Sequence, residues 1–391
     1  MSLPNLTVVD DEADLAELVC DIAEEAGFNA CKYSDAELFK REFSHSADVI
    51  VLDLMMPGVD GIEVIRFLAE RQCSALLVLM SGFDVGVLHS AQQLAAEQGL
   101  NLVKSINKPF RPDELEQLLR ELPVADISNS QHREVFVPTI TELRKALHND
   151  ELTVYFQPKV SISADHYYAV EALARWIHPE KGMMSPALFI PLAEENQLID
   201  ELTWVIFRKA MECCHGWHLR GVEIKVALNM SALTLRDLEL PEKMAKLAQE
   251  YGIAPSQIVL EITESSLMLE LIKSLDILTR FRIKGFSLSI DDFGTGYSSL
   301  LHLYRAPFSE MKIDQSFVTN MANDTEAHTI VETIISLAHN LKMYTVAEGV
   351  ETEECYQLLC KLGCDQVQGY LLAKPMPEKE LIDWFSKKIS R

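Results

Sequence analysis

The stretch FSLSIDDFGTGYSSLL, residues Phe286–Leu301, decides how the longer part of the chain is interpreted. Its first five residues have the length and flanking signals of a buried strand. The strand ends at two adjacent carboxylates, Asp291 and Asp292, and Ser298 and Ser299 then precede an apolar run that is typical of a helix start. Two acids at one strand end repel each other unless a cation lies between them. A lone pair of this kind is more often a turn that caps the next helix, so the interpretation depends on the rest of the chain.

Polar residues recur at the ends of other short apolar runs. Tyr167–Trp176 alternates so that Glu171, Leu173 and Arg175 share one face. The other runs that we interpret as strands are Leu152–Phe156, Ile224–Leu228, Val259–Ile262, Met311–Ile313, Tyr344–Ala347 and Gln366–Val367. The polar residues in or just after these runs are Gln157, Asn229, Glu261, Glu264, Lys312, Glu348, Glu351 and Gln368. About eight strands with helices between most of them predict a TIM-type (β/α)8 barrel, in which the carboxyl ends of the strands meet at one site.

The first third of the chain also alternates strand-like and helix-like segments, in fewer units. Its five strand-like runs, separated by amphipathic segments, predict a flavodoxin-like (βα)5 domain with a doubly wound parallel sheet. Asp10 and Asp11 follow the first run, and Asp53 follows the third. Ser81 closes the fourth run and Lys108 follows the fifth. Strand ends of a parallel sheet converge, so we expect one pocket that holds Mg2+ and transfers a phosphoryl group to an acid, rather than a set of solvated loop acids.

Length and composition bound the class of protein. A chain of 391 residues suggests two domains, which we expect at residues 1–122 and 138–391 with a polar linker at 123–137. The formal net charge of −24 argues against a general basic surface for DNA or an anionic membrane. The eight cysteines lack a paired zinc spacing and indicate free thiols in a reducing compartment. With no signal peptide and no apolar run of about 18 residues, we expect a cytoplasmic protein that binds neither DNA nor a membrane.

The first domain resembles the receiver domain of two-component response regulators, through the acids, the serine and the lysine at its strand ends. The resemblance implies that Asp53 accepts a phosphoryl group and that Asp10 and Asp11 hold Mg2+ beside it. It also implies that Ser81 is the switch hydroxyl and that Lys108 binds the phosphate. The donor would be a cognate sensor histidine kinase or a phosphotransfer protein.

One position departs from the receiver pattern. Receivers usually carry a rotating Tyr or Phe three residues before the phosphate-binding lysine, and Ser105 stands there in this chain. The serine at position 81 can still bond a phosphoryl group. We therefore expect the signal to leave the domain by domain rearrangement rather than through an aromatic switch.

The longer domain resembles the EAL family of cyclic-di-GMP phosphodiesterases over about Val137 to Phe385. The motifs that carry the resemblance are Glu171-Ala172-Leu173, Glu261-Ile262-Thr263-Glu264, Asp291–Leu300, Glu348-Gly349-Val350-Glu351 and Gln368-Gly369-Tyr370. The joint occurrence of these motifs in this order is highly specific. The resemblance implies a response regulator that hydrolyses cyclic di-GMP to linear 5'-pGpG under the control of receiver phosphorylation.

The motifs of the longer domain offer oxygen donors and use neither Cys nor His, which favours Mg2+ or Mn2+ over zinc. Two adjacent aspartates suit a pair of ions roughly 3.5–4 Å apart. The resemblance assigns metal ligation to Glu171, Asn229, Glu261, Asp291 and Asp292. It implies that Glu348 serves the second metal site or acts as general base, and that Lys312 orients the attacking water or the phosphate.

The remaining motif residues concern the substrate and a loop. The resemblance implies that the substrate contacts Gln157, Leu173, Arg175 and Gln368, and that Glu264 and Glu351 stabilise the loop at Phe293–Ser299. From the residues alone, Arg175 could instead form a structural ion pair. Loops of this type line a barrel dimer interface in the family, so a homodimer or higher homo-oligomer is expected.

Two rival functions remain open at this point. One is a catalytically inactive receptor that binds cyclic di-GMP without cutting it, and the other is a metal-dependent enzyme that acts on a different phosphodiester. Every ligand position that we can place is filled by the expected residue type. An active phosphodiesterase is therefore the leading hypothesis.

Overall fold

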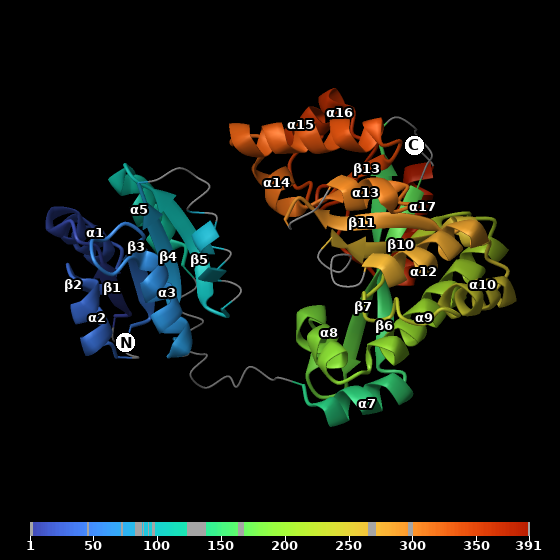
Figure 1. Cartoon of the computed structure of the whole chain (residues 1–391), viewed down its shortest axis with the longest axis horizontal. Coiled ribbons are helices and arrows are strands. Elements are labelled where there is room, and N and C mark those ends of the chain that lie inside the picture. Colours follow the sequence, from blue (N-terminus) through green and yellow to red (C-terminus); the bar gives the residue numbers. More distant parts are fainter. Residues whose placement is uncertain are drawn as a thin grey trace. The chain divides into compact units, whose positions relative to one another are not determined.

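The computed structural model describes residues 3–44, 47–71, 73–82, 88, 90–92, 94–95, 98–122, 138–162, 168–264, 271–295 and 300–389. The chain divides into two compact units, Met1–Phe136 and Val137–Arg391 (Figure 1). The domain and linker bounds given above stay predictions. Among the helices of the described residues, none combines the length and apolar character that crossing a bilayer requires.

The first unit is a five-stranded parallel sheet in the order β2-β1-β3-β4-β5, which confirms the flavodoxin-like prediction. Its strands are β1 (Asn5–Val9), β2 (Asn29–Tyr33), β3 (Val49–Asp53), β4 (Leu76–Ser81) and β5 (Asn101–Asn107). Its helices include α1 (Ala13–Glu25), α2 (Ala36–Glu42), α3 (Gly61–Glu70) and α5 (Pro112–Arg120).

Both faces of this sheet are buried, because strand side chains alternate between them. Val49 and Val51 of β3 pack in a core with α1 and α5. Ile50 and Leu52 face the opposite core, which contains α2 and α3. The central strand β3 is therefore a continuous apolar run that ends at Asp53, a carboxylate that is itself buried.

The second unit is a closed barrel, in which β6, β14, β13, β12, β11, β10, β9 and β7 form a ring and β8 pairs with the outer edge of β7. The strands are β6 (Leu152–Ser161), β7 (Tyr168–His178), β8 (Gly182–Met184), β9 (Lys225–Asn229), β10 (Ile258–Thr263), β11 (Ser287–Phe293), β12 (Glu310–Ile313), β13 (Tyr344–Ala347) and β14 (Gln366–Val367). The predicted barrel is confirmed. We call the carboxyl ends of its parallel strands the mouth and their amino ends the floor.

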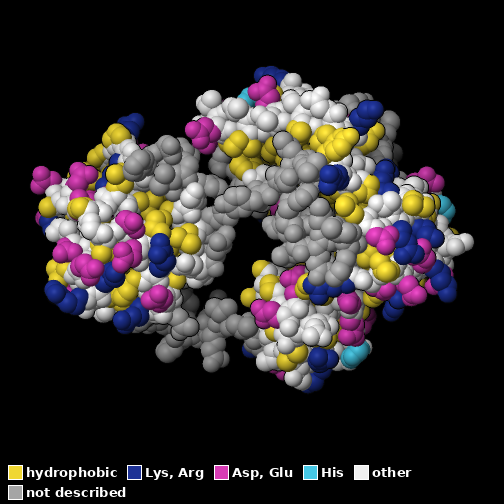
Figure 2. Space-filling model, in the orientation of Figure 1, with side chains coloured by type: hydrophobic (Ala, Val, Ile, Leu, Met, Phe, Trp, Pro, Cys, Tyr) yellow, Lys and Arg dark blue, Asp and Glu magenta, His cyan; other side chains and the backbone are white. Residues whose placement is uncertain are grey.

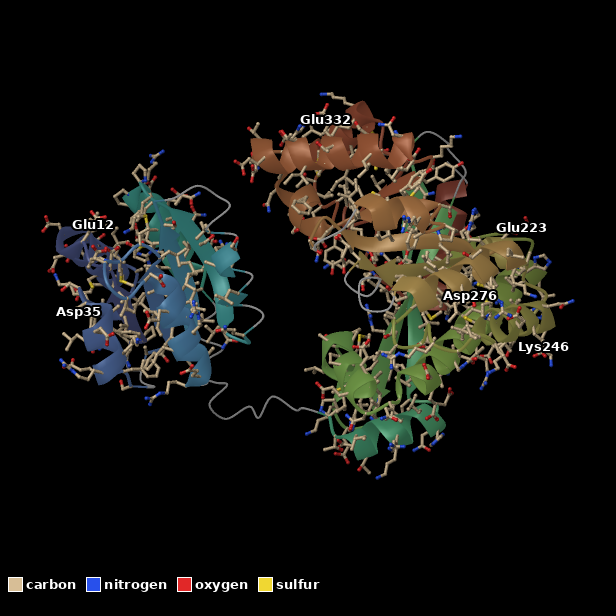
Figure 3. All side chains as sticks on the ribbon, in the orientation of Figure 1. Glu12, Asp35, Glu223, Lys246, Asp276 and Glu332 are labelled. Atoms are coloured by element: carbon tan, nitrogen blue, oxygen red, sulfur yellow. The ribbon has the colours of Figure 1, made fainter. Side chains whose placement is uncertain are left out.

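Helices cover the outside of this barrel (Figure 1). They are α7 (Ile140–His148), α8 (Pro186–Glu195), α9 (Ile199–Leu219), α10 (Leu240–Glu250), α12 (Leu271–Lys284), α13 (Leu300–Arg305), α14 (Gln315–Asn320), α15 (Thr325–Asn340), α16 (Glu353–Leu362) and α17 (Glu378–Ile389). Figure 2 shows acidic and basic side chains interspersed on the visible face. In Figure 3, Glu223, Lys246 and Asp276 lie on the outside of the barrel unit, as solvated charges should.

One strand departs from a regular (β/α)8 barrel, because β6 runs antiparallel to both neighbours, β7 and β14. The chain between Ser161 and Tyr168 is too short for a helical crossover, and a parallel pair would need one. Gln157 is therefore opposite Glu171, whereas Lys159 is opposite Ala169, one layer nearer the floor. Both side chains point to the barrel interior, since residues two apart share a strand face.

Candidate active site

The adjacent carboxylates Asp291 and Asp292 both reach the mouth because the strand is irregular there. Consecutive residues of a regular strand point to opposite faces. The register of β11 against β12 shifts between Ile290 and Phe293. Asp292 also has a φ of 53°, a left-handed conformation that a non-glycine residue adopts only when its surroundings enforce it. This bulge turns two neighbouring side chains towards one site.

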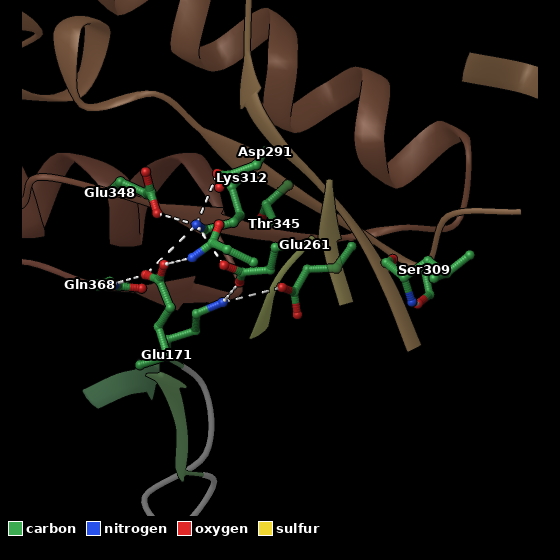
Figure 4. A network of polar contacts seen from close by, with 12 residues as sticks. Glu171, Glu261, Asp291, Ser309, Lys312, Thr345, Glu348 and Gln368 are labelled. Carbon is green, nitrogen blue, oxygen red and sulfur yellow. Dashed lines mark hydrogen bonds and ion pairs between the residues drawn. The ribbon is translucent and has the colours of Figure 1, made fainter. Parts of the chain in front are cut away.

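Lys312 occupies the centre of the mouth and is 1% exposed. Its Nζ lies 2.6 Å from Glu348 Oε1, 2.8 Å from Asp291 Oδ1 and 3.0 Å from Glu261 Oε2. Glu171 Oε2 is slightly farther away, at 3.8 Å (Figure 4). Four strands thus direct their carboxylates at one ammonium group, which explains how so many acids can share a buried site.

A chain of amides fixes Glu171. Asn229 Nδ2 donates to Glu171 Oε1 at 2.7 Å, and Gln368 Nε2 donates to Glu171 Oε2, also at 2.7 Å. The same Gln368 nitrogen donates to Gln157 Oε1 at 3.0 Å, and Gln157 in turn donates to the carbonyl of Ala373. The amides leave Glu171 little freedom to rotate.

Two glycines allow close packing around the loops after β13 and β14, Gly369 against Val350 and Gly349 against the start of α14. A Cβ at Gly369 would lie 2.1 Å from the carbonyl oxygen of Val350, and one at Gly349 would lie 2.5 Å from Gln315 Cβ. Gly349 also has a φ of 67°. These glycines directly follow Glu348 and Gln368, so the close backbone approach sets where both functional side chains begin.

Carboxylates outnumber lysines at the mouth, and their pKa values show the imbalance. Burial raises the pKa of Glu261 to about 8, although Lys159 and Lys312 oppose the effect. Burial likewise raises the pKa of Glu348 to about 7. Burial also acts on Glu171, but Lys312, Lys159 and the two amides outweigh it and lower its pKa to about 2. The two lysines do not neutralise all the carboxylates at the mouth. A further cation would lower the pKa values that burial has raised.

The same mouth has the donors that a hard metal ion requires. Oxygen atoms of Asp291, Asp292 and Glu348 all lie within 4.8 Å of one another, and burial raises the pKa of Asp292 to about 6. Oxygen ligands at such spacing suit Mg2+ or Mn2+. These three carboxylates fit a divalent cation, because its charge would neutralise the negative charge that Lys312 does not.

A mostly apolar cavity of about 280 Å3 opens beside the mouth. Its wall includes Leu173, Asn229 and Glu261, together with apolar side chains of α8 and α9. Arg175 is half-buried, with Nη1 donating to the carbonyl of its neighbour Ala174 at 2.8 Å and Cζ 5.7 Å from the Tyr155 ring centroid. The mouth thus combines charged groups with an apolar recess, as a site for a phosphate-linked ring compound would.

The first unit has a second acidic pocket at the carboxyl ends of β1 and β3. Lys108 Nζ lies 2.8 Å from Asp10 Oδ2 and 2.7 Å from Asp53 Oδ2. Asp10, Asp11 and Asp53 place carboxylate oxygens within 4.8 Å of one another, which suits one Mg2+. Burial raises the pKa of Asp10, against the effect of Lys108.

Ser81 ends β4 beside this pocket and is fully buried, and its carbonyl accepts a hydrogen bond from Lys108 N at 2.7 Å. Ser105, at the position expected for an aromatic switch, is half-buried on β5. Its hydroxyl accepts a hydrogen bond from Gln92 Nε2 at 2.5 Å. The structure therefore brings together the five predicted pocket residues and gives Ser105 a specific polar partner.

Each of the two units matches a family model. Residues 140–375 match the EAL domain, and residues 6–120 match the response regulator receiver domain. The chain belongs to the EAL family. Its first unit is a receiver domain, so receiver and EAL domain follow each other in one chain.

Known members of the EAL family resemble this chain over different lengths. The cyclic di-GMP phosphodiesterase RocR of Pseudomonas aeruginosa is 33% identical over 340 residues, which cover 87% of this chain and 87% of RocR. The bifunctional diguanylate cyclase/cyclic di-GMP phosphodiesterase MucR of Pseudomonas aeruginosa is 40% identical over 242 residues, which cover 62% of this chain and 35% of MucR. A solved structure described as "PaMucR Phosphodiesterase, c-di-GMP complex" matches with a TM-score of 0.59 at 40% identity, covering 62% of this chain and 98% of that chain. The chain spans most of RocR but about a third of MucR.

Two acids of the EAL domain were expected to stabilise a loop. Glu264 is 1% exposed, and its Oε2 accepts a hydrogen bond from Gly294 N at 2.9 Å. Glu351 is exposed, and among the described residues it makes no hydrogen bond or ion pair. Ser298 and Ser299 lie outside the described residues, and α13 begins at Leu300. The loop roles of both acids stay predictions.

Sequence reasoning missed Lys159 and its partner Glu310 in the EAL domain. Lys159 is 1% exposed, and its Nζ contacts Glu261 Oε1 and lies 3.5 Å from Glu310 Oε1. The available signal was the period of the strand, since Lys159 follows Gln157 by two residues and must share its face. The apolar run that predicts this strand ends at Phe156, whereas β6 continues to Ser161 and includes Lys159.

Proposed function

We propose that the chain is a response regulator whose EAL domain hydrolyses cyclic di-GMP to linear 5'-pGpG. Membership of the EAL family and the likeness to RocR, over 87% of both chains, support the substrate. The observation that carries the proposal is the partly buried acidic cluster of Asp291, Asp292 and Glu348 at the mouth, of which Asp291 and Glu348 form ion pairs with Lys312. Such a concentration of acid is costly in stability and is typical of a catalytic site.

We propose Mg2+ or Mn2+ as the cofactor, with two ions in the EAL domain. The ligands would be Glu171, Asn229, Glu261, Asp291 and Asp292, with Glu348 at the second ion. Two such ions, when bound, neutralise the phosphate and lower the pKa of a water molecule aligned with the leaving oxygen. The oxygen donors and their uncompensated charge support this assignment.

Three residues supply the remaining chemistry of the EAL domain. The ammonium group of Lys312 is fixed beside Asp291 and Glu348. In this position it can donate a hydrogen bond to a phosphate oxygen at the mouth. If Glu348 does not serve the second ion, its carboxylate, whose pKa burial raises to about 7 in the metal-free protein, would instead accept the proton of an attacking water as general base. Gln368 keeps Glu171 in one orientation, so the substrate meets a preorganised site.

Substrate recognition would combine the apolar cavity with polar side chains at the mouth. Gln157, Leu173, Arg175 and Gln368 would contact the substrate, and the apolar cavity of about 280 Å3, which Leu173 helps to line, would receive part of a base. The Arg175 guanidinium can pair with a phosphate or stack on a base. This arrangement suits a cyclic dinucleotide, which presents phosphates and flat rings together.

The receiver is proposed to take a phosphoryl group on Asp53 from a sensor histidine kinase or a phosphotransfer protein. Lys108 lies 2.7 Å from Asp53 and would neutralise the transferred charge, with one Mg2+ held by Asp10, Asp11 and Asp53. Ser81 would bond the phosphoryl group. Asp53→Asn should lose the phosphoryl adduct that mass spectrometry detects after incubation with acetyl phosphate and Mg2+, and equal uptake by the variant would refute the assignment.

Turnover is the decisive test of the EAL domain. Purified full-length protein with Mg2+ or Mn2+ should convert cyclic di-GMP to 5'-pGpG, measured by chromatography, and should lose this activity in EDTA. Glu171→Ala and Asp291→Ala should abolish turnover, whereas Glu223→Ala, on the outside of the barrel unit, should not. Hydrolysis without metal would refute the two-ion mechanism, and tight binding without any turnover would favour a receptor. We propose a homodimer or higher assembly through the barrel, which light scattering tests separately.

A further inference from the structure

The barrel interior contains a lysine that the proposed mechanism does not use. Lys159 lies on the antiparallel strand β6, between the layer of Gln157 and the floor, and is 1% exposed. Lysine is almost never buried to this extent unless it is paired. Below it, a cavity of about 460 Å3 opens at the floor, lined by Lys159, Lys225 and Glu310 among others.

Lys159 and Lys312 divide the two oxygens of Glu261 between them. Lys159 Nζ contacts Oε1, and Lys312 Nζ lies 3.0 Å from Oε2. Glu261 is itself 1% exposed, so both oxygens depend on these partners (Figure 4). With Oε1 held by Lys159, the carboxylate has a fixed rotation, and Oε2 is the oxygen left on the side of Lys312 and the other acids.

A purely structural role explains this ion pair poorly. A buried pair is often no more stable than apolar side chains of the same size, because both charges lose their hydration. Lys159 also has a second acid, Glu310, at 3.5 Å, so it does not need Glu261 as its only counter-charge. What Lys159 provides beyond this pairing is a cation on Oε1 of Glu261, the oxygen that faces away from Lys312.

We propose that Lys159 is a positioning residue of the metal site, which holds Oε1 of Glu261 so that Oε2 is presented to a divalent cation. The inference rests on the proposed function, since it takes Glu261 to be a metal ligand. Lys159 itself contacts neither the cation nor the substrate. Partners that orient a metal ligand typically contribute 10–100-fold to metal affinity, and we expect an effect of that size here.

The test is Mn2+ binding to the full-length protein without substrate, measured by isothermal titration calorimetry. Lys159→Met should weaken Mn2+ affinity about 10–100-fold. Lys225→Met removes the same charge from the same floor cavity and is the matched control, with affinity within about 2-fold of wild type. Lys159→Arg keeps a donor at Glu261 and should recover part of the loss.

Turnover adds a second readout that a loss of packing would not reproduce. At saturating Mn2+, Lys159→Met should recover most of its kcat, because the cation then replaces the missing positioning. Wild-type Mn2+ affinity in Lys159→Met, or equal losses in Lys225→Met, would overturn the proposal. If Lys159→Met does not fold, Lys159→Gln and Lys159→Arg decide the matter by the same comparison. If Glu171→Ala also binds Mn2+ normally, the metal site of the proposed function fails instead.

Discussion

Replacing Gly369 with alanine should damage the mouth of the barrel without removing any polar group. A Cβ at this position would lie 2.1 Å from Val350 O and 2.3 Å from Val350 N, which are backbone atoms that no rotamer change can move. Real Cβ atoms essentially never approach a heavy atom closer than 3.0 Å. The segments around Gly369 and Val350 must therefore separate by about 0.9 Å. This separation is costly, because the closely packed interior resists displacement.

Separating Gly369 from Val350 would also displace functional side chains at the mouth, because these side chains are close neighbours of the two residues in the sequence. Gln368, which orients Glu171, directly precedes Gly369, and Glu348 lies two residues before Val350. A misplacement of about 1 Å costs roughly 100-fold in rate when reacting groups must be aligned. Overpacking costs about 1–3 kcal/mol, which corresponds to a fall in Tm of roughly 2–10 °C for a domain of this size. We expect Gly369→Ala to lose about 100-fold in kcat/KM for cyclic di-GMP and to remain folded at 25 °C.

The assay is product formation with Mn2+, followed by chromatography, alongside thermal unfolding by circular dichroism. Gly363→Ala is the control, because Gly363 ends α16 with a φ of 77° and its added Cβ would meet nothing within 4 Å. That variant should lose about 1 kcal/mol through backbone strain while keeping its kcat/KM. Turnover of Gly369→Ala within 3-fold of wild type would show that the close backbone approach does not position Gln368, and the reasoning would be wrong.

Three further predictions concern pH, a helix cap and the receiver. Burial raises the pKa of Glu348 from 4.5 to about 7, so the folded protein binds more protons than the unfolded chain between these values. The metal-free protein should therefore lose stability as the pH rises through this window, and Glu348→Gln should flatten the fall in thermal unfolding with EDTA. Thr139→Ala removes the capping box with Glu142 at the start of α7 and should cost about 1 kcal/mol of unfolding free energy at unchanged turnover. Gln92→Ala removes the hydrogen bond to Ser105 and should reduce the change in hydrogen exchange that phosphorylation causes, at normal phosphoryl uptake. An unchanged pH slope, a wild-type stability or an unchanged exchange difference would contradict the respective prediction.

Much of the fold was predictable because local periodicity and strand ends carry the information. A buried strand such as Val49–Asp53 is a short apolar run with an acid at its end, whether or not the rest of the chain is known. Parallel strands end at one edge, so polar residues that follow them must converge. This single rule places Asp291 and Glu348 at one mouth, and Asp10 and Asp53 in one pocket. Glu171 lies within β7, and the period of that strand turns its side chain to the interior.

The tertiary structure decided what happens between elements. The period of β6 does not indicate that the strand is antiparallel, because an apolar run has the same period in either direction, and only the short connection to β7 bears on its direction. Only the closed ring brings Lys159 to Glu261, 102 residues away along the chain. The bulge at Asp292 likewise comes from pairing with β12, and an isolated strand would point the two adjacent aspartates to opposite faces.

By itself, therefore, the sequence determined which elements form and which ends of them carry charge, since backbone preference and side-chain period act within a few residues. The tertiary structure alone decided how each charge is paired. Lys312 forms ion pairs with Asp291 and Glu348, whereas Lys159 forms an ion pair with Glu261 from the floor side of the barrel. Ion pairing in a buried site depends on distances of a few ångströms across the barrel, and these exist only once the ring has closed.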